Sequence, residues 1–187
     1  MTTYRQIHGR SIQAVTTDPT GDVAEGQIWY NTTTNAFKTV LVNEAWSSAS
    51  ALSTAVYNNA GAGIQTAALS TGGTESPSTA RSTNTEEYNG SGWSTGGTLN
   101  TGRFALGGFG TQTAAYVAGG NTSPGGGVTN ATESYNGTSW TSMSSPSNLN
   151  TSISYMSQST LGTSTAGLMC GGTPPTTGAT EEFDGTS

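Results

Sequence analysis

Apolar and polar positions alternate over short stretches of this chain, and nowhere do apolar residues recur with the 3.6-residue period of a helix. Runs rich in Thr, Val, Tyr and Ala are separated by clusters of Gly, Asn, Ser and Pro, which supply turns. Near the middle of the chain this pattern predicts four strands, at about 104–106, 113–118, 131–135 and 139–142. We therefore predict an all-β fold with essentially no helix.

Turn signals support the same interpretation. The pair Asn136-Gly137 lies between two predicted strands, and an Asn-Gly pair in that setting is a strong hairpin signal. The glycine runs at 107–110 and 125–127 are also interpreted as turns, because they lack the lysine and the strand-to-helix context of a phosphate-binding loop.

A repeat of 47 residues organises most of the chain. Three tryptophans, two diglycines and two tyrosines recur at this spacing, and a third copy follows after a short insertion, with Phe in place of Tyr. Two further motifs keep the same order: a glutamate shortly before each aromatic residue (Glu86, Glu133, Glu181), and a Leu-Asn-Thr or Leu-Ser-Thr motif after each Trp. The positions that define the repeat are Trp46, Trp93, Trp140, Tyr88, Tyr135, Phe183, Gly72, Gly73, Gly119, Gly120, Gly171 and Gly172.

A four-stranded unit of this length, with a diglycine, then an aromatic residue, then a Trp, resembles the kelch repeat of β-propellers. The resemblance implies that each diglycine ends an inner strand and that the aromatic residues and Trp pack between blades. The spacing departs from the kelch pattern, since only four residues separate Tyr88 from Trp93. A β-solenoid that stacks its repeats without closing is the alternative. The run at 136–140 also resembles the Asp-box turn of sialidase-type propellers, but that motif has one residue between its acid and its glycine.

The repeats predict kelch-like units at about 46–92, 93–139 and 140–187, and an N-terminal module at 1–45. Propellers usually close with four to eight blades, so about three blades form an incomplete ring. The third copy predicts a Trp one position beyond Ser187, and we expect the residues to be part of a longer polypeptide. Closure by oligomerisation is the weaker alternative, because an open array exposes an edge strand.

The N-terminal module has a different pattern. A short strand is predicted within 11–20, ending in an Asp-Pro turn, followed by a hairpin with strands at 28–30 and 36–41 and a turn at 31–35. The stretch from Gly26 to Val40 resembles a small module of structural proteins from tailed phages, particularly those of marine cyanobacteria. That resemblance implies an N-terminal attachment segment; a hairpin that caps the repeat array is the plainer alternative.

Charge and composition narrow the function classes. The net charge is −6 with only five Lys and Arg, so no basic patch is available for nucleic acid. No apolar stretch is long enough to span a membrane, and the N-terminus does not resemble a signal peptide. The one cysteine, Cys170, cannot form an intrachain disulfide, and its apolar neighbours predict a buried, inert thiol.

Residues for catalysis are scarce. His8 is the only histidine, so neither a histidine-based metal site nor a Ser/His/Asp triad can form within the chain, and we expect no cofactor. The acidic pairs Glu86-Glu87 and Glu181-Glu182 fit the two carboxylates of glycoside hydrolysis, but because they recur at one repeat position we interpret them as a solvated repeat feature. We therefore expect a protein that is not an enzyme.

The resemblance to phage appendage proteins implies a tail fibre or related structural protein, assembled in the host cytoplasm and carried on the virion. Its N-terminal segment would contact other virion proteins, and its repeats would bind a host-surface glycan or protein through polar loops and exposed aromatics such as Tyr116 and Tyr155. A homo-oligomer is expected, as is common for fibres. The alternatives are a scaffold subunit of a capsid, neck or extracellular filament and, more distantly, a glycan-degrading propeller enzyme.

Overall fold

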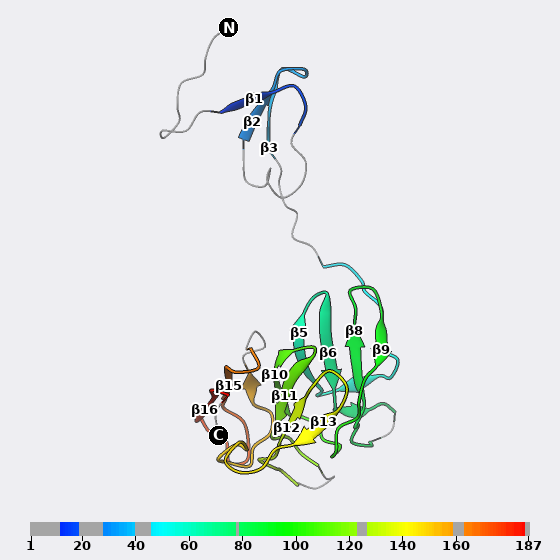
Figure 1. The fold of residues 1–187 in the computed structure, drawn as a ribbon, viewed down its shortest axis with the longest axis vertical. Helices are drawn as coiled ribbons and strands as arrows, with labels where there is room; N and C mark the ends of the chain where they lie inside the picture. Colours follow the sequence, from blue (N-terminus) through cyan, green and yellow to red (C-terminus); the bar gives the residue numbers. More distant parts are fainter. Residues whose placement is uncertain are drawn as a thin grey trace. The chain divides into compact units, whose positions relative to one another are not determined.

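The computed structural model of the chain is all-β, which confirms that part of the prediction. Within the residues that it describes, every regular element is a β-strand and none is a helix (Figure 1). The chain divides into two compact units, residues 1–48 and 49–187, and each is considered by itself below. The described residues are 12–18, 28–39, 46–77, 79–122, 127–158 and 163–185.

The N-terminal unit contains a three-stranded sheet. Its strands are β1 (Gln13–Val15), β2 (Ile28–Asn31) and β3 (Ala36–Thr39), with β1 parallel to β2 and β2 antiparallel to β3. The β2–β3 turn is closed by the Asn31 side chain, whose oxygen accepts the N–H groups of Thr33 and Thr34, each at 2.9 Å. The predicted hairpin is confirmed, although residues 40 and 41 of its second strand lie outside the described residues.

Asp18 ties the first strand of this unit to the hairpin. Its carboxylate accepts hydrogen bonds from Trp29 Nε1 at 3.0 Å and Asn31 Nδ2 at 2.6 Å, and pairs with Lys38 Nζ at 2.6 Å. These three donors, Lys38 most strongly, lower the pKa of Asp18 from 3.8 to about 2. A polar network therefore holds together a sheet that is too small to bury a large apolar core.

The repeat unit contains three sheets of one design, which we name sheets I, II and III. In sheets I and II four consecutive antiparallel strands lie side by side in chain order; sheet III has three such strands. The only described strands of this unit outside the three sheets, β4 (Val56–Tyr57) and β7 (Thr74–Glu75), form an antiparallel pair. Sheet I comprises β5 (Ala60–Ile64), β6 (Ala67–Thr71), β8 (Thr85–Tyr88) and β9 (Trp93–Thr95); sheet II β10 (Gly107–Thr111), β11 (Ala114–Ala118), β12 (Thr132–Tyr135) and β13 (Trp140–Ser142); sheet III β14 (Ser157–Gln158), β15 (Gly167–Cys170) and β16 (Thr180–Phe183).

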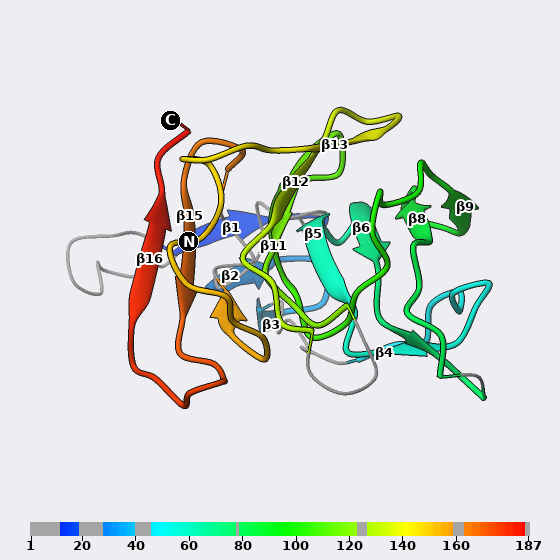
Figure 2. The ribbon, with the colours of Figure 1, turned by 90° about the horizontal axis from the view of Figure 1, so that it is seen from below.

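The three sheets lie in a row with sheet II in the middle (Figure 2). The first strand of sheet II, β10, packs beside β5 of sheet I on one side and beside β14 and β15 of sheet III on the other. The structure thus shows several small antiparallel sheets, and the described strands do not close into a propeller.

The first strand of sheet II lies three residues later than predicted. It covers Gly107–Thr111 rather than 104–106, and its glycines, interpreted above as a turn, form a strand. A Cβ on Gly107 would overlap the sulfur of Met169 in sheet III, and a Cβ on Gly108 would come within 3.0 Å of the Ala60 Cβ in sheet I. Glycine is needed here because neighbouring sheets approach β10 on both faces, and a pattern of polar and apolar residues does not reveal that requirement.

The other strands of sheet II match the prediction within one residue, and the Asn-Gly turn is confirmed. Asn136 Oδ1 accepts the N–H groups of Thr138 and Ser139, each at 2.9 Å, while Gly137 adopts a φ of 89°. Of the pair, only the glycine needs a positive φ; the asparagine contributes its side-chain oxygen.

Candidate functional site

The six diglycine positions lie directly after the second strand of each sheet. All six residues have positive φ, between 66° and 109°. In each pair the second glycine approaches the chain that leads into the first strand of its own sheet: a Cβ would come within 2.9 Å of the Tyr57 oxygen at Gly73 and of the Phe104 oxygen at Gly120. Glycine is therefore required twice over, by conformation and by close approach.

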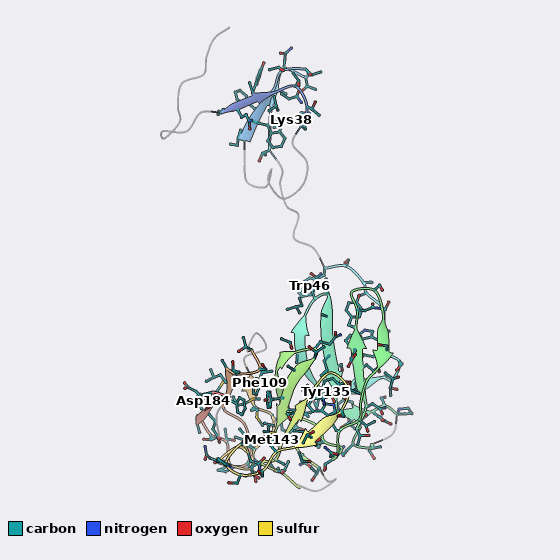
Figure 3. The ribbon with its side chains drawn as sticks, viewed as in Figure 1. Lys38, Trp46, Phe109, Tyr135, Met143 and Asp184 are labelled. Carbon is teal, nitrogen blue, oxygen red and sulfur yellow. The ribbon has the colours of Figure 1, made fainter. Side chains whose placement is uncertain are left out.

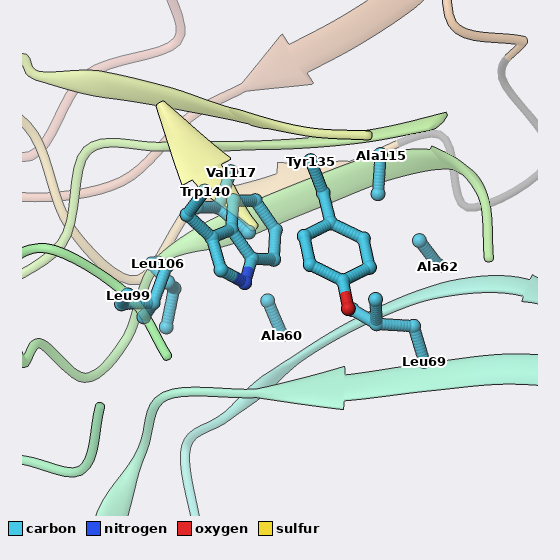
Figure 4. Close-up of a cluster of buried hydrophobic side chains, with 9 residues drawn as sticks. All are labelled: Ala60, Ala62, Leu69, Leu99, Leu106, Ala115, Val117, Tyr135 and Trp140. Atoms are coloured by element: carbon cyan, nitrogen blue, oxygen red, sulfur yellow. The ribbon is translucent and has the colours of Figure 1, made fainter. Parts of the chain in front are cut away.

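Two aromatic repeat residues of sheet II, Tyr135 and Trp140, fill the interface with sheet I (Figure 4). Their rings lie 4.8 Å apart at 32°, and both residues are buried. Trp140 Nε1 donates to Thr85 Oγ1 at 2.9 Å, and Tyr135 Oη donates to Glu87 Oε1 at 2.6 Å. Burial, followed by the bond to Glu87, raises the pKa of Tyr135. The buried cluster at this interface is Ala60, Ala62, Leu69, Leu99, Leu106, Ala115, Val117, Tyr135 and Trp140.

Phe183 has the same position at the interface between sheets II and III. Its ring lies 4.8 Å from that of Tyr116 and 5.4 Å from that of Phe109, and the Phe109 and Tyr116 rings are stacked at 5.3 Å. Tyr116, expected to be an exposed loop aromatic, is instead half-buried in β11, so that expectation is wrong. Figure 3 marks Phe109 and Tyr135 among the side chains of the repeat unit.

The remaining aromatic repeat residues lie away from these two interfaces. Tyr88 and Trp93 are half-buried and pack on each other at 5.0 Å, and Trp93 Nε1 donates to the Ser50 oxygen at 3.0 Å. Because neighbouring strand residues point to opposite faces and Glu87 faces sheet II, Tyr88 lies on the opposite face of sheet I. Trp46 is fully exposed, at 105%.

The three repeat glutamates bind backbone, and two of them are buried, so the expectation that they are solvated is wrong. Glu86 is 7% exposed and accepts the Ser53 N–H at 2.9 Å; Glu133 is 1% exposed and accepts the Asn100 N–H at 2.8 Å. In the third copy Glu181, half-buried, accepts the Asn150 N–H at 2.7 Å. The Leu-Asn-Thr motif thus recurs because each glutamate anchors it to the third strand of the sheet that it precedes.

Arg103 forms a buried ion pair with Glu133 that the repeat pattern does not indicate. Both side chains are almost fully buried, at 1% and 2%. Arg103 also donates to the backbone oxygens of Ala131 at 2.8 Å and Gly119 at 3.2 Å, so it links the second and third strands of sheet II. No other copy has an arginine at this position, which explains why self-similarity missed it.

A strip of exposed side chains lies where the chain enters the first strand of each sheet. Tyr155 is 55% exposed and packs edge-on against Phe104 at 5.8 Å, and the Arg81 guanidinium lies 4.1 Å above the Phe104 ring. Arg81 also donates to Thr74 Oγ1 at 3.2 Å, and Thr74 pairs with Tyr57, which is 52% exposed. We call Tyr57, Arg81, Phe104 and Tyr155 the aromatic strip.

The backbone beneath this strip is held in an uncommon conformation. Asn58, Ala105 and Tyr155 occupy equivalent positions of the three copies, and all have φ between 52° and 57°. They are linked in series, since the Ala105 N–H donates to the Asn58 oxygen at 2.8 Å and the Tyr155 N–H to the Ala105 oxygen at 2.9 Å. Positive φ is uncommon for alanine and tyrosine, and such strain concentrates at functional sites. Tyr155 was expected to be exposed, and it is; the ladder beneath it has no signature in residue type.

Two small pockets flank sheet III. The larger, of about 110 Å³, lies between sheets II and III and is lined by residues that include Phe109, Thr132, Leu149 and Phe183. The smaller, of about 80 Å³, includes Met156. Cys170, expected to be buried, is half-buried.

Within the described residues there is no cluster of three His, Cys, Asp or Glu side chains suited to a metal ion. The same residues include no helix with the length and apolar character needed to cross a membrane. Comparison with known protein families and with curated proteins finds no match to this chain.

Proposed function

We propose that sheets I to III are blades of a kelch-like β-propeller. Three features support this: sheets I and II share one strand order, with sheet III following it for three strands; the diglycines end equivalent strands; and Tyr135 and Phe183 pack on the preceding sheet. The first strands β5, β10 and β14 lie next to one another, as the innermost strands of adjacent blades do.

The function that the site supports best is recognition of a surface glycan or protein by the aromatic strip, as the binding part of a virion appendage such as a tail fibre. The observation that carries it is the juxtaposition of Tyr57, Arg81, Phe104 and Tyr155 on a hydrogen-bonded ladder. Tyrosine and arginine dominate binding hot spots, and aromatic faces offer large contact area at little cost in side-chain entropy. The phage context, including a virion location and an N-terminal attachment segment, comes from the resemblance of residues 26–40.

Recognition here is passive. The carboxylates that a hydrolase would use are occupied, because Glu133 is paired with Arg103 and Glu86 and Glu181 hold backbone N–H groups. The aromatic strip has no carboxylate among its four residues, so it is suited to stacking and hydrogen-bond donation rather than to acid–base chemistry.

The test is binding of the whole chain to an array of bacterial surface glycans and to host cells. We expect Tyr155→Asn, whose replacement tolerates positive φ, and Arg81→Gln each to weaken binding at least about tenfold. Phe37→Ala, which removes an exposed aromatic of the N-terminal unit, is the matched control and should bind normally. Binding that is unchanged by both strip substitutions would contradict the proposal.

A scaffold role is the second candidate, and one observation favours it: sheet III ends at β16 with an edge that no described strand covers. An uncovered edge is suited to packing between subunits. Labelling the chain in intact particles for electron microscopy separates the two roles, because a scaffold would lie within the particle shell or neck and a receptor-binding protein at the distal end of a fibre.

A further inference from the structure

The pocket between sheets II and III is the equivalent of the space that Trp140 fills between sheets I and II. Thr85, which accepts the Trp140 N–H, is equivalent by the 47-residue repeat to Thr132, and Thr132 lines the pocket. Tyr135, which stacks on Trp140, is equivalent to Phe183, another lining residue. The pocket therefore has the hydrogen-bond acceptor and the aromatic wall of an indole site.

Sheet III also lacks the strand that would carry such an indole. In sheet II, β13 pairs with β12 so that Trp140 lies opposite Tyr135, and in sheet I Trp93 lies opposite Tyr88 in the same register. Sheet III ends at β16, whose outer edge no described strand pairs. The vacant indole site and the uncovered edge lie side by side, because Phe183 belongs to both.

The chain carries one surplus strand of the required type. Trp46-Ser47-Ser48 matches Trp93-Ser94-Thr95 and Trp140-Thr141-Ser142 and precedes the second by 47 residues. Unlike the other two, it belongs to no sheet, and the Trp46 side chain is fully exposed. A large exposed indole is unfavourable in water and indicates a binding partner.

We propose that residues 46–48 of one copy form the fourth strand of sheet III in a second copy, with the Trp46 indole in the pocket beside Thr132. The register follows from sheets I and II: Trp46 lies opposite Phe183, and Ser48 opposite Glu181. Each of two copies donates its strand to the other, and the dimer contains six blades, within the range in which propellers close.

Strand donation within one copy is excluded by reach. Hydrogen bonds from Ser50 to Ser91 and from Trp93 to Ser50 hold residue 50 at the outer part of sheet I. Four residues extend about 14 Å at most, whereas the two sheet-to-sheet spacings from sheet I to sheet III add up to about 20 Å. The donor must therefore be a second molecule. The same arrangement brings the exposed Leu168, equivalent to the buried Leu69, toward the Tyr88 face of the partner.

Light scattering after size exclusion tests the proposal first, on the whole chain over a range of concentrations. We expect the wild-type chain to approach twice its 18.9 kDa mass as concentration rises, and Trp46→Ala to stay at 18.9 kDa. Ile64→Ala, which removes another exposed apolar side chain, is the control and should dimerise. A wild-type chain that stays monomeric, or Trp46→Ala with the wild-type mass, would overturn the proposal.

A photocrosslinker at position 46 tests the contact itself. A mixture of ¹⁴N- and ¹⁵N-labelled chains carrying benzoylphenylalanine there should give mixed-isotope crosslinks to peptides that contain Thr132 or Phe183. Crosslinks of a single isotope would show donation within one chain, and crosslinks to other peptides would place Trp46 elsewhere; either result contradicts strand donation by a second copy.

Discussion

The two interfaces between the sheets are built on one plan but filled differently. Between sheets I and II small residues such as Ala60 and Ala115 leave room for Tyr135 and Trp140, and polar atoms of the rings find partners on sheet I. Between sheets II and III the larger Phe109 and two methionines occupy the interface, and the position equivalent to Trp140 is a pocket. The comparison shows that the repeat conserves backbone path and register more strictly than core composition.

Trp140→Ala breaks the fuller interface and should have the largest effect. Removing a buried indole costs about 4 kcal/mol in the free energy of unfolding. The equivalent Trp93→Ala, at a half-buried position, should cost no more than about 1.5 kcal/mol. Urea unfolding of the two variants measures the difference, and equal losses would contradict the assignment of Trp140 to the core.

Glu133→Gln tests the ion pair that only sheet II contains. The substitution leaves the Arg103 charge buried without its partner, and we expect a loss of about 3 kcal/mol in unfolding free energy. Glu181→Gln removes the corresponding carboxylate from sheet III, where no buried arginine is left behind, and should cost about 1 kcal/mol. Denaturant midpoints of the two variants are the measurement; a larger loss at Glu181 would reverse the comparison.

Gly108→Ala examines how closely sheets I and II approach. The added Cβ would meet the Ala60 Cβ and the Gly61 oxygen, each at 3.0 Å, and overpacking of this kind costs about 2 kcal/mol. The equivalent Gly61 has only an ordinary contact at 3.6 Å, so Gly61→Ala should change the melting temperature little. Similar melting temperatures for both variants would show that the sheets can separate freely.

Tyr135→Phe makes the first interface resemble the second, since Phe183 has no hydroxyl. The loss of the bond to Glu87 should cost about 1 kcal/mol at neutral pH. Because the pKa of Tyr135 is raised above its ordinary value of 10.0, its contribution to stability is full below pH 10 and is lost as the pH rises through the folded-state pKa. Unfolding curves of wild type and variant should therefore converge above pH 10, and a gap that widens there would contradict the assignment.

Much of the architecture could be predicted from the chain alone. The positions of the strands after each diglycine, the Asn-Gly turns and the N-terminal hairpin follow from local residue preferences, and the structure places them within one or two residues of the prediction. The 47-residue spacing located the residues of the interfaces because each copy solves the same packing problem.

What the chain did not show depends on contacts between distant segments. Gly107 and Gly108 lie in a strand because of sheets that the local pattern does not include. The burial of Glu133 depends on Arg103, 30 residues earlier and unique to one copy. Likewise, Tyr116 is packed because Phe183 reaches it from the next sheet.

The most direct test of the equivalence of the two interfaces is an NMR titration of the Trp46→Ala chain with a peptide of residues 136–143. The peptide carries the Trp140 indole and the strand that pairs with β12. The account predicts chemical-shift changes at Thr132, Phe183 and the β16 backbone, and none with the same peptide bearing Ala at the Trp140 position. Equal responses to both peptides, or no response at these residues, would contradict it.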